Sequence, residues 1–240
     1  MKNTENSGRS VEWYRERIDY LRGFMREERY DTLCQTLAMR TKYMTLMAEN
    51  TFHPHNASAL VRHCEAFGVQ TMHTVETCCK FDLSETIMRG THKWVDIESH
   101  DSTAEALAAL RKEGYRIVAT TPHRESCTPE SFDVTKGKFV LVFGTEHTGI
   151  SDEVIAEADE FLKIPMCGMV ESLNVSASAA ILIYILSQRM RATVNDWHLS
   201  ERERLEMHFR WLMSSARDPF GVLNRQFPDT PIFKTPQPNK

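Results

Sequence analysis

Short apolar segments alternate with amphipathic segments in the middle of this chain, and this alternation restricts its possible folds more than any other feature. The apolar segments have the length and continuity of buried strands, and they lie at residues 43–48, 69–75, 94–97, 115–120, 139–143 and 160–164. Segments with helical spacing separate them, such as residues 56–67 before Gly68 and residues 102–112 before Gly114. Strands that are apolar on both faces are typical of a parallel sheet covered by helices on both sides. We therefore predict an α/β fold with a mostly parallel sheet flanked by helices.

Helical extensions flank this region on both sides. One helix is predicted over residues 11–40 and a charged helix after Leu199, whereas the five prolines from Asp218 onward predict an irregular tail. Within the sheet region, a short helix follows Ser151 and a long helix covers residues 172–191. We expect three parts, which are an Arg-rich helical extension (1–42), the sheet-containing domain (43–191), and a helical extension with a Pro-rich tail (192–240).

The composition excludes several classes of protein. The formal net charge of -4 argues against a globally basic chain that coats nucleic acid. The longest apolar stretch, residues 175–186, is interrupted by serines and is too short to cross a bilayer, and the N-terminus lacks the apolar core of a signal peptide. We therefore expect a cytoplasmic protein with no membrane span and with reduced cysteines. His53 and His55 have no third convergent ligand in the sequence, so no metal is expected.

Charge is distributed unevenly along the chain. Residues 51–186 carry eleven Lys and Arg against nineteen Asp and Glu, whereas both flanks have a small positive excess in which arginine predominates. Arginine suits phosphate recognition, because its planar group offers paired N–H donors. The alternative is a solvated helix face with intrahelical ion pairs, such as Glu12 with Arg15. Charge alone leaves both interpretations open.

Four loops at the predicted strand ends are candidates for ligand binding, because ligands of parallel sheets bind beyond the carboxyl ends of the strands. These loops are rich in Gly, Pro, Asn and Glu and cover residues 49–56, 121–124, 144–149 and 165–174. The third loop nearly matches the phosphate-binding pattern GxxxxGK[ST], but Ile150 stands in place of the lysine. The patterns GxGxxG, GxSxG and HExxH are absent. The sequence thus argues against nucleotide triphosphatases and against the common dehydrogenases and hydrolases.

Three segments resemble, in chain order, the motifs of the SpoU (TrmH) family, which comprises RNA 2'-O-ribose methyltransferases of the SPOUT superfamily. These segments are NASALVRHCEAFG (56–68), LVFGTEHTGIS (141–151) and IPMCGMVESLNVSASAA (164–180), and the resemblance spans most of residues 45–191. It implies an α/β fold whose C-terminal part forms a deep trefoil knot, an exception to the rule that chains are unknotted. It also implies S-adenosylmethionine as the methyl donor and a homodimer with active sites at the interface.

The resemblance further implies which residues form the site. Family members hold the cofactor mostly through backbone groups, which correspond here to Thr121, Gly144, Ile164 and Leu173. The catalytic positions correspond to Asn56, Arg62, Glu146, Ser172 and Asn174. An arginine stays protonated and is a poor base, so Arg62 is expected to orient the ribose hydroxyl and its phosphate and to stabilise developing negative charge. Without the resemblance, Asn56 and Ser172 equally suit plain helix N-caps.

The flanking helices resemble those of the tRNA branch of the family, which modifies guanosine-18 in the D-loop. The resemblance therefore assigns tRNA binding to arginines of the two flanks, namely Arg15, Arg17, Arg22, Arg189 and Arg191. Residues 77–86, TCCKFDLSET, do not match the family's usual loop, which leaves the choice of substrate open. The alternatives are the same reaction on rRNA or on another tRNA nucleotide, and a non-catalytic RNA-binding module.

Overall fold

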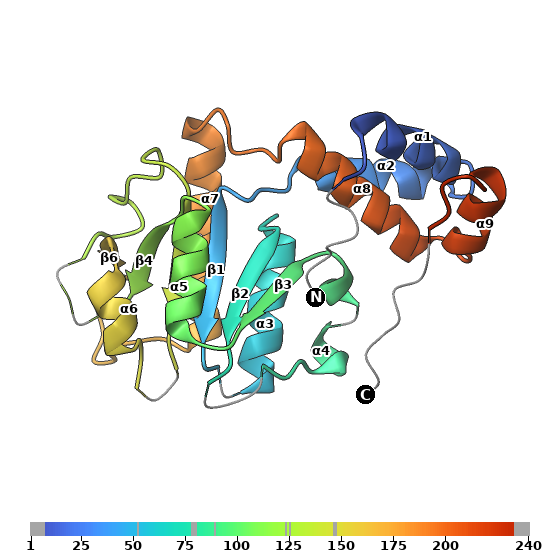
Figure 1. Cartoon of the computed structure of the whole chain (residues 1–240). Coiled ribbons are helices and arrows are strands. Elements are labelled where there is room, and N and C mark those ends of the chain that lie inside the picture. Colours follow the sequence, from blue (N-terminus) through green and yellow to red (C-terminus); the bar gives the residue numbers. More distant parts are fainter. Residues whose placement is uncertain are drawn as a thin grey trace. The chain divides into compact units, whose positions relative to one another are not determined.

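A six-stranded parallel sheet with the order β3-β2-β1-β5-β4-β6 forms the middle layer of residues 40–198 (Figure 1). This computed structural model describes residues 8–51, 53–77, 81–88, 90–122, 124, 126–145 and 148–232. The strands are β1 (Met44–Glu49), β2 (Thr71–Val75), β3 (Asp96–His100), β4 (Arg116–Thr120), β5 (Phe139–Phe143) and β6 (Glu160–Leu162). Each pair of neighbouring strands is parallel, so that Leu46 of β1 stands opposite Met72 of β2 and Leu141 of β5. The predicted parallel sheet is confirmed.

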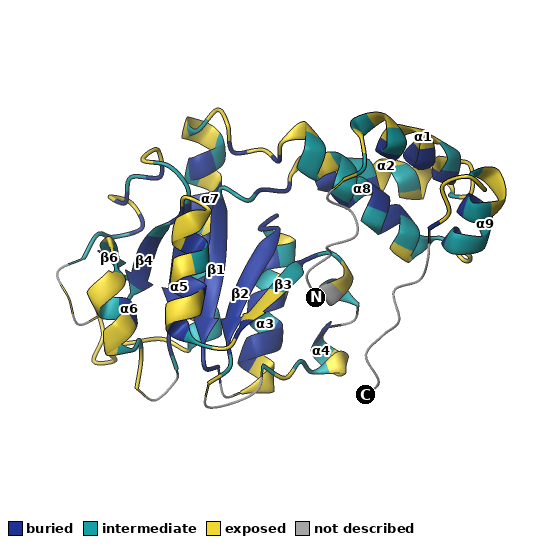
Figure 2. Ribbon diagram, in the orientation of Figure 1, coloured by how far each residue is buried: buried dark blue, intermediate teal, exposed yellow. Residues whose placement is uncertain are grey.

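Helices cover both faces of this sheet and bury it. One core cluster joins the sheet to α3 and α7 and includes Leu60 and Leu182, and the other joins it to α5 and α6 and includes Leu107 and Val154. The central strands are accordingly buried along their whole length, as Figure 2 shows in dark blue. The helical elements here are α3 (Pro54–Ala66), α4 (Glu85–Met88), η1 (Thr91–Lys93), α5 (Thr103–Lys112), α6 (Asp152–Glu157) and α7 (Val175–Thr193).

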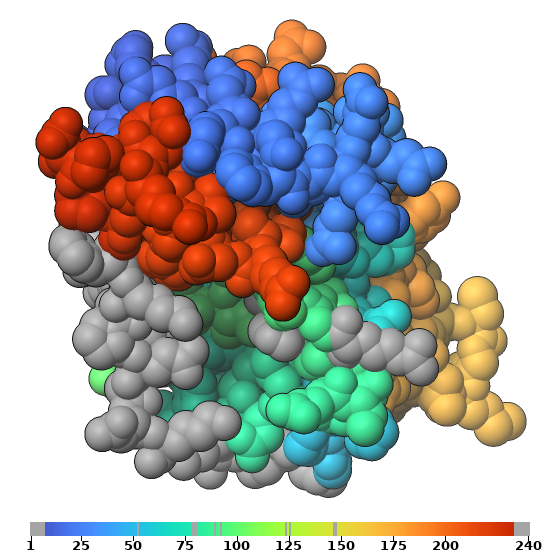
Figure 3. Space-filling view, turned by 90° about the vertical axis from the view of Figure 1, so that its right-hand side faces the viewer, coloured from blue at the N-terminus to red at the C-terminus, as the bar shows by residue number. Residues whose placement is uncertain are grey.

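The two terminal extensions, which were predicted as separate parts, form one compact unit. The chain divides into residues 40–198 and a second unit made of residues 8–39 and 199–232. The second unit holds α1 (Val11–Arg22), α2 (Glu27–Ala38), α8 (Glu201–Ser215) and α9 (Pro219–Gln226). Trp13 and Tyr14 of α1 pack edge-on against Phe209 of α8, with ring centroids 5.2 and 5.7 Å apart. Figure 3 shows the N-terminal helices in blue against the C-terminal helices in red.

Three predicted helix boundaries are wrong. The single helix expected over residues 11–40 is two helices, because the chain turns after Gly23 and each half packs its own apolar face against α8. The tail after Asp218 is not irregular throughout, since Pro219 occupies the first turn of α9 and the Asp218 carboxylate accepts from the Gly221 N–H at 3.1 Å. The long helix α7 starts at Val175 rather than at residue 172. Every helix among the described residues is too short or too polar to span a lipid bilayer.

Candidate active site

The strand order brings the predicted loops together at one edge of the sheet. Strands β2 and β3 lie on one side of β1, and strands β5, β4 and β6 lie on its other side. The direction in which the chain adds strands to the sheet therefore reverses between β1 and β5. Open parallel sheets bind ligands beyond the carboxyl ends of the strands at such a reversal. Gly144 directly follows β5, Thr121 directly follows β4, and Ile164 lies two residues beyond β6. Three of the four positions expected to hold the cofactor are therefore on neighbouring strand ends.

The loop after β5 is folded back on itself, and glycine is required at its start. The Thr145 N–H donates to the Gly149 carbonyl at 2.9 Å, and the Gly149 N–H donates to the Thr145 carbonyl at 3.1 Å. A β-carbon on Gly144 would clash with the Gly149 carbonyl and the Ile150 nitrogen. Gly149 itself has a φ of 72°, in the left-handed region that suits glycine. Glu146, which the sequence assigned to catalysis, lies outside the described residues.

Glu49, at the end of β1, fastens this loop to two helices and was missed in the sequence. Its side chain is 3% exposed. It accepts from the Ser151 N–H at 3.1 Å and Oγ at 2.7 Å, and from the Thr103 Oγ1 at 2.6 Å. Ser151 and Thr103 lie at the starts of α6 and α5. The sequence did contain a signal for Glu49, namely a carboxylate at the end of a mostly apolar strand.

Asn50, which follows Glu49, takes a left-handed backbone conformation with φ 51°. Asparagine tolerates this conformation better than most residues. Its side-chain oxygen accepts from the Thr77 N–H at 2.9 Å and from the Thr77 hydroxyl at 3.0 Å. The chain is thereby turned sharply at the end of β1, towards the start of α3 at Pro54.

Asn56 and Asn174 connect the first and third motifs directly. The Asn174 Nδ2 donates to the Asn56 Oδ1 at 3.2 Å, while the Asn174 Oδ1 caps α7 by accepting from the Ser176 N–H at 2.9 Å. Asn56 is 7% exposed and lies in the first turn of α3, which packs against α7. The N-cap interpretation of Asn56 is wrong, because α3 begins at Pro54 and His53 is its N-cap. Asn174 is more than an N-cap, because its amide joins two helices that are far apart in the chain.

Arg62 lies farther along α3 with an exposed side chain. Its Nη1 donates to the Ile87 carbonyl at 2.7 Å, beside α4. This bond links α3 to α4, because Ile87 lies within α4. Neighbouring His63 has its pKa lowered because burial disfavours the charged ring. Arg62 is thus an exposed N–H donor next to a partly buried imidazole.

The segment before α7 exposes apolar and polar side chains. Met169 is fully exposed, and Val170 and Leu173 are 61% and 37% exposed. Ser172 is also exposed and does not cap α7, because Asn174 occupies that position. Exposed apolar residues in one segment mark a surface that binds a ligand or a partner.

The arginines assigned to RNA lie in different environments. Arg17 is only 2% exposed and is stacked between the rings of Trp13 and Phe227, at 4.1 and 4.2 Å from their centroids. Its assignment as an RNA contact is wrong in this structure, since a buried guanidinium cannot meet a phosphate. Arg15 is exposed and ion-paired with Glu201, and Arg22 is exposed and lies over the Tyr30 ring.

The two arginines assigned on α7 are partly used by the protein itself. Arg189 donates to the Pro129 carbonyl. Arg191 donates to the Phe67 carbonyl at 2.7 Å and lies 5.1 Å from the Trp197 ring centroid. Arg191 is partly buried, and this burial lowers the pKa of its guanidinium. Both bonds fasten α7 within its own unit, which weakens the assignment of these arginines to RNA.

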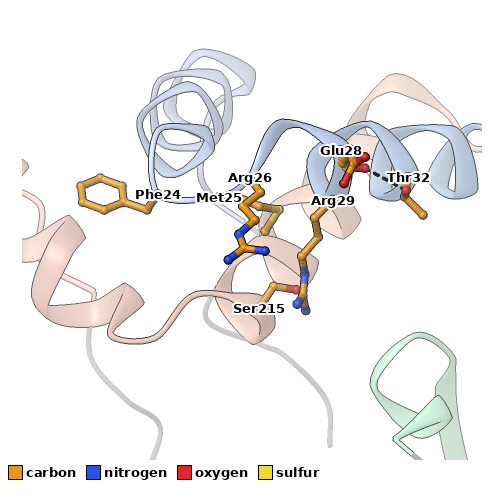
Figure 4. Close-up of a pocket in the computed structure, with 7 residues that line it drawn as sticks. All are labelled: Phe24, Met25, Arg26, Glu28, Arg29, Thr32 and Ser215. Carbon is orange, nitrogen blue, oxygen red and sulfur yellow. Dashed lines mark hydrogen bonds between the residues drawn. The ribbon is translucent and has the colours of Figure 1, made fainter.

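A hollow in the helical unit carries two arginines that the sequence analysis did not single out. It has a volume of about 780 Å³ and lies beside the turn between α1 and α2. Figure 4 shows the Arg26 and Arg29 guanidinium groups pointing to the same side, near Ser215 of α8. The remaining lining residues are Phe24, Met25, Glu28 and Thr32. Phe24 is 56% exposed. Exposed arginines beside an exposed aromatic ring suit single-stranded nucleic acid.

Comparison with protein families gives one match, to the SpoU rRNA Methylase family over residues 43–184. Among curated proteins, the tRNA (guanosine(18)-2'-O)-methyltransferase of Borreliella burgdorferi is 33% identical over 195 residues, which cover 81% of this chain and 89% of that protein. The match extends beyond the sheet-containing unit into the helical unit, since it covers more residues than the family model does.

Two solved structures have the same fold. The TrmH/SpoU tRNA modifying enzyme of Aquifex aeolicus is 34% identical, with a TM-score of 0.69 over 79% of this chain and 97% of that chain. The SpoU methyltransferase AviRb of Streptomyces viridochromogenes, in complex with AdoMet, is 21% identical, with a TM-score of 0.56 over 66% of this chain and 62% of that chain. The second likeness extends to the fold alone.

Proposed function

We propose, because this chain belongs to the SpoU rRNA methylase family, that it transfers a methyl group from S-adenosylmethionine to the 2'-hydroxyl of a tRNA ribose. Guanosine-18 in the D-loop is the proposed position, in line with the name of the relative from Borreliella burgdorferi. The observation that carries the proposal is the Asn174–Asn56 hydrogen bond, which joins two of the three motifs beside the reversal of strand order. A tRNA substrate implies a cytoplasmic location.

The neighbouring strand ends suit an adenosyl group. Backbone N–H and C=O groups there can read an adenine edge, and the glycine after β5 lets the following loop fold back at the strand end. Exposed apolar side chains before α7 can cover the ligand. The residues proposed to hold S-adenosylmethionine are Thr121, Gly144, Ile164 and Leu173. When bound, this cofactor supplies an electrophilic methyl group on a positively charged sulfur.

Arg62 acts in this proposal on the acceptor side of the reaction. A ribose hydroxyl is a weak nucleophile and gains negative charge as it loses its proton. A guanidinium has five N–H donors, and Arg62 uses one of them for the Ile87 carbonyl. Other N–H groups of the same guanidinium are proposed to donate to the ribose hydroxyl oxygen and to the adjoining phosphate. Asn56 and Asn174 hold α3 and α7 in register, which positions Arg62. Ser172 and Glu146 are proposed to complete the pocket.

The helical unit is proposed to dock the tRNA. Arg15 and Arg22 are exposed there, and Arg26 and Arg29 line the hollow beside α2. These four replace buried Arg17 as the proposed phosphate contacts. Arg189 and Arg191 are proposed as weaker contacts at the surface of α7, because their guanidinium groups already bond to backbone carbonyls.

Two further features of the family belong to the proposal. The chain between β6 and α7 is proposed to take part in a deep trefoil knot. A second copy of the chain is proposed to cover the apolar residues exposed before α7 together with Tyr184, which is 52% exposed. Light scattering after gel filtration is expected to show a dimer, and Tyr184→Arg is expected to shift it toward a monomer.

Transfer of labelled methyl groups tests the function. Purified full-length protein, S-adenosylmethionine and unmodified tRNA are expected to give 2'-O-methylguanosine at position 18, mapped by mass spectrometry of nuclease digests. A product at another nucleotide would keep the reaction and change the substrate. Binding of tRNA without any transfer would instead favour a non-catalytic RNA-binding module. The matching family is described as rRNA methylases, so rRNA is the second candidate substrate. Fragments of rRNA are therefore tested beside tRNA in the same assay.

Arg62→Ala is expected to lower the rate of methyl transfer by about 100-fold or more, since a stabilising donor for the oxyanion is lost. Affinity for S-adenosylmethionine, measured by calorimetry, is expected to change little because Arg62 acts on the acceptor. The matched control is Lys112→Ala, an exposed cation at the end of α5. An equal loss of cofactor affinity in Arg62→Ala would contradict the acceptor-side role.

A further inference from the structure

Two histidines and one glutamate share one face of the sheet, outside the residues assigned above. In the parallel pair β2–β3, His73 stands opposite Glu98, and Val75 stands opposite His100. Alternate residues of a strand point to the same face, so the side chains of His73, Glu98 and His100 lie together. His73 also stands opposite Met47 of β1, which belongs to the core beneath α5. The group therefore links a buried strand to the edge strand β3.

The nitrogen and oxygen atoms of these side chains lie close enough together to converge on one ion. The Nδ1 of His73 lies 3.1 Å from the Nε2 of His100 and 3.9 Å from the Oε2 of Glu98. One ligand atom from each residue falls within 4.8 Å of the others. In a tetrahedral zinc site with bonds of 2.0–2.1 Å, two ligand atoms lie about 3.3 Å apart. The two nitrogens are already near this separation, and a small rotation of the half-exposed Glu98 side chain supplies the rest.

The surroundings favour a cation. His73 and His100 are 2% and 8% exposed, so their rings are held in place by the fold. Glu113 and Asp96 add negative charge around Glu98, and Lys42 adds one positive charge. Solvent reaches the group through the exposed carboxylate of Glu98, which gives an ion a way in.

We propose that His73, Glu98 and His100 bind one Zn²⁺ ion, with water as the fourth ligand. Two imidazole nitrogens and one carboxylate suit zinc better than Mg²⁺ or Ca²⁺, which prefer all-oxygen sites. The bound ion would cross-link β2 to the edge strand β3 and stabilise that side of the sheet. The proposal stands apart from methyl transfer and does not depend on it.

Calorimetric titration of the full-length protein, first stripped with a chelator, tests the site. We expect one Zn²⁺ per chain, no response to Mg²⁺, and a higher midpoint of thermal unfolding with zinc. Substitution with Co²⁺ is expected to give the visible absorption of a four-coordinate site. Glu98→Gln is expected to weaken zinc binding at least about tenfold, and His100→Asn to abolish the stoichiometric component.

Matched controls separate this site from adventitious binding to surface groups. Glu153→Gln removes an exposed carboxylate on α6, and His55→Asn removes an exposed histidine on α3. Both controls are expected to bind zinc as the wild type does. Because Glu98 is half exposed, Glu98→Gln should keep the fold, which circular dichroism without metal can check. Unchanged zinc affinity in Glu98→Gln and His100→Asn, or no stoichiometric binding to the wild type, would reduce the group to a hydrogen-bonded histidine pair.

Discussion

Asn174 performs two tasks through one side-chain amide. Its oxygen caps α7, and its nitrogen donates to the Asn56 oxygen on α3. A serine or an aspartate would also cap a helix, but neither offers the N–H that reaches Asn56. The residue is thus required for the connection between the motifs rather than for the cap, and a comparison with an ordinary cap separates the two contributions.

Asn174→Ala is expected to destabilise the sheet-containing unit by about 1 kcal/mol through loss of the cap, and also to abolish most methyl transfer. Ser102→Ala is the matched control, because Ser102 caps α5 by accepting from the Glu105 N–H at 3.2 Å. It is expected to show the same loss of stability in urea unfolding with nearly full activity. Equal activity of the two variants would show that the Asn56 contact does not matter.

Gly144→Ala tests the folded-back loop after β5. The added methyl group would clash with the Gly149 carbonyl, so the loop must open at a cost of about 1–3 kcal/mol. Thermal unfolding is expected to shift downward, and affinity for S-adenosylmethionine is expected to fall with it. Gly23→Ala is the control, since a β-carbon there makes an ordinary contact with the Tyr20 carbonyl at 3.4 Å. Normal cofactor binding by Gly144→Ala would remove this loop from the proposed pocket.

At the scale of elements, the positions of the buried strands were predictable, whereas the environment of charges was not. The edge strand β3 covers Asp96–His100 instead of the predicted residues 94–97, because a half-exposed edge strand lacks a continuous apolar pattern. Residues 139–143 are apolar throughout, and β5 covers the same residues. A strand that is buried on both faces is apolar at every position, so the sequence pattern identifies it. Arg15 and Arg17 are two residues apart and so lie on different faces of α1, and Arg17 shares the buried face of Tyr14 and Leu21. Helical spacing therefore separates the buried arginine from the exposed one. It does not show that Trp13 and Phe227, from two ends of the chain, enclose the Arg17 guanidinium, because that contact depends on tertiary structure.

The α1–α2 turn gives a prediction about RNA at this scale. Arg26→Gln with Arg29→Gln is expected to weaken tRNA binding and to reduce the slope of log affinity against log salt by about one to two. Arg217→Gln with Arg225→Gln is the control, because both residues are exposed on the same unit and outside the hollow. Binding is measured by fluorescence anisotropy at several salt concentrations. The same slope in both double variants would make the hollow a solvated surface.

At the scale of the whole molecule, two units fold from one chain whose ends belong to the same unit. The sheet-containing unit is continuous, whereas the helical unit brings residues 8–39 together with residues 199–232. The sequence shows apolar residues on each of these helices but not that Phe209 meets Trp13, since nothing in local spacing encodes a contact between distant segments. The loops that carry the three motifs, by contrast, follow β1, β5 and β6, whose carboxyl ends the parallel topology places at one edge of the sheet.

The helical unit is expected to lose stability in acid because of His208. Burial on α8 lowers the pKa of His208 to about 4, with Arg204 acting in the same direction and Asp19 opposing it. The ring lies 5.4 Å from the Tyr30 ring, and its Nε2 is 3.8 Å from the Cys34 sulfur, so α2 covers it. The unfolded chain takes up a proton near pH 6.5 and the folded unit only near pH 4. The contribution of the neutral His208 ring to the stability of the helical unit is therefore complete above pH 6.5, and it is lost as the pH falls toward 4.

Thermal unfolding between pH 7.5 and 4 measures this effect, which is on the order of 2 kcal/mol. His208→Gln is expected to flatten the pH dependence of the helical unit, because the group that must bind a proton on unfolding is gone. His198→Gln is the control, since His198 is exposed and stacks on Trp197 in the other unit. It is expected to leave the pH dependence of the helical unit as in the wild type. A wild-type slope in His208→Gln would assign the acid sensitivity of the helical unit to other titratable groups.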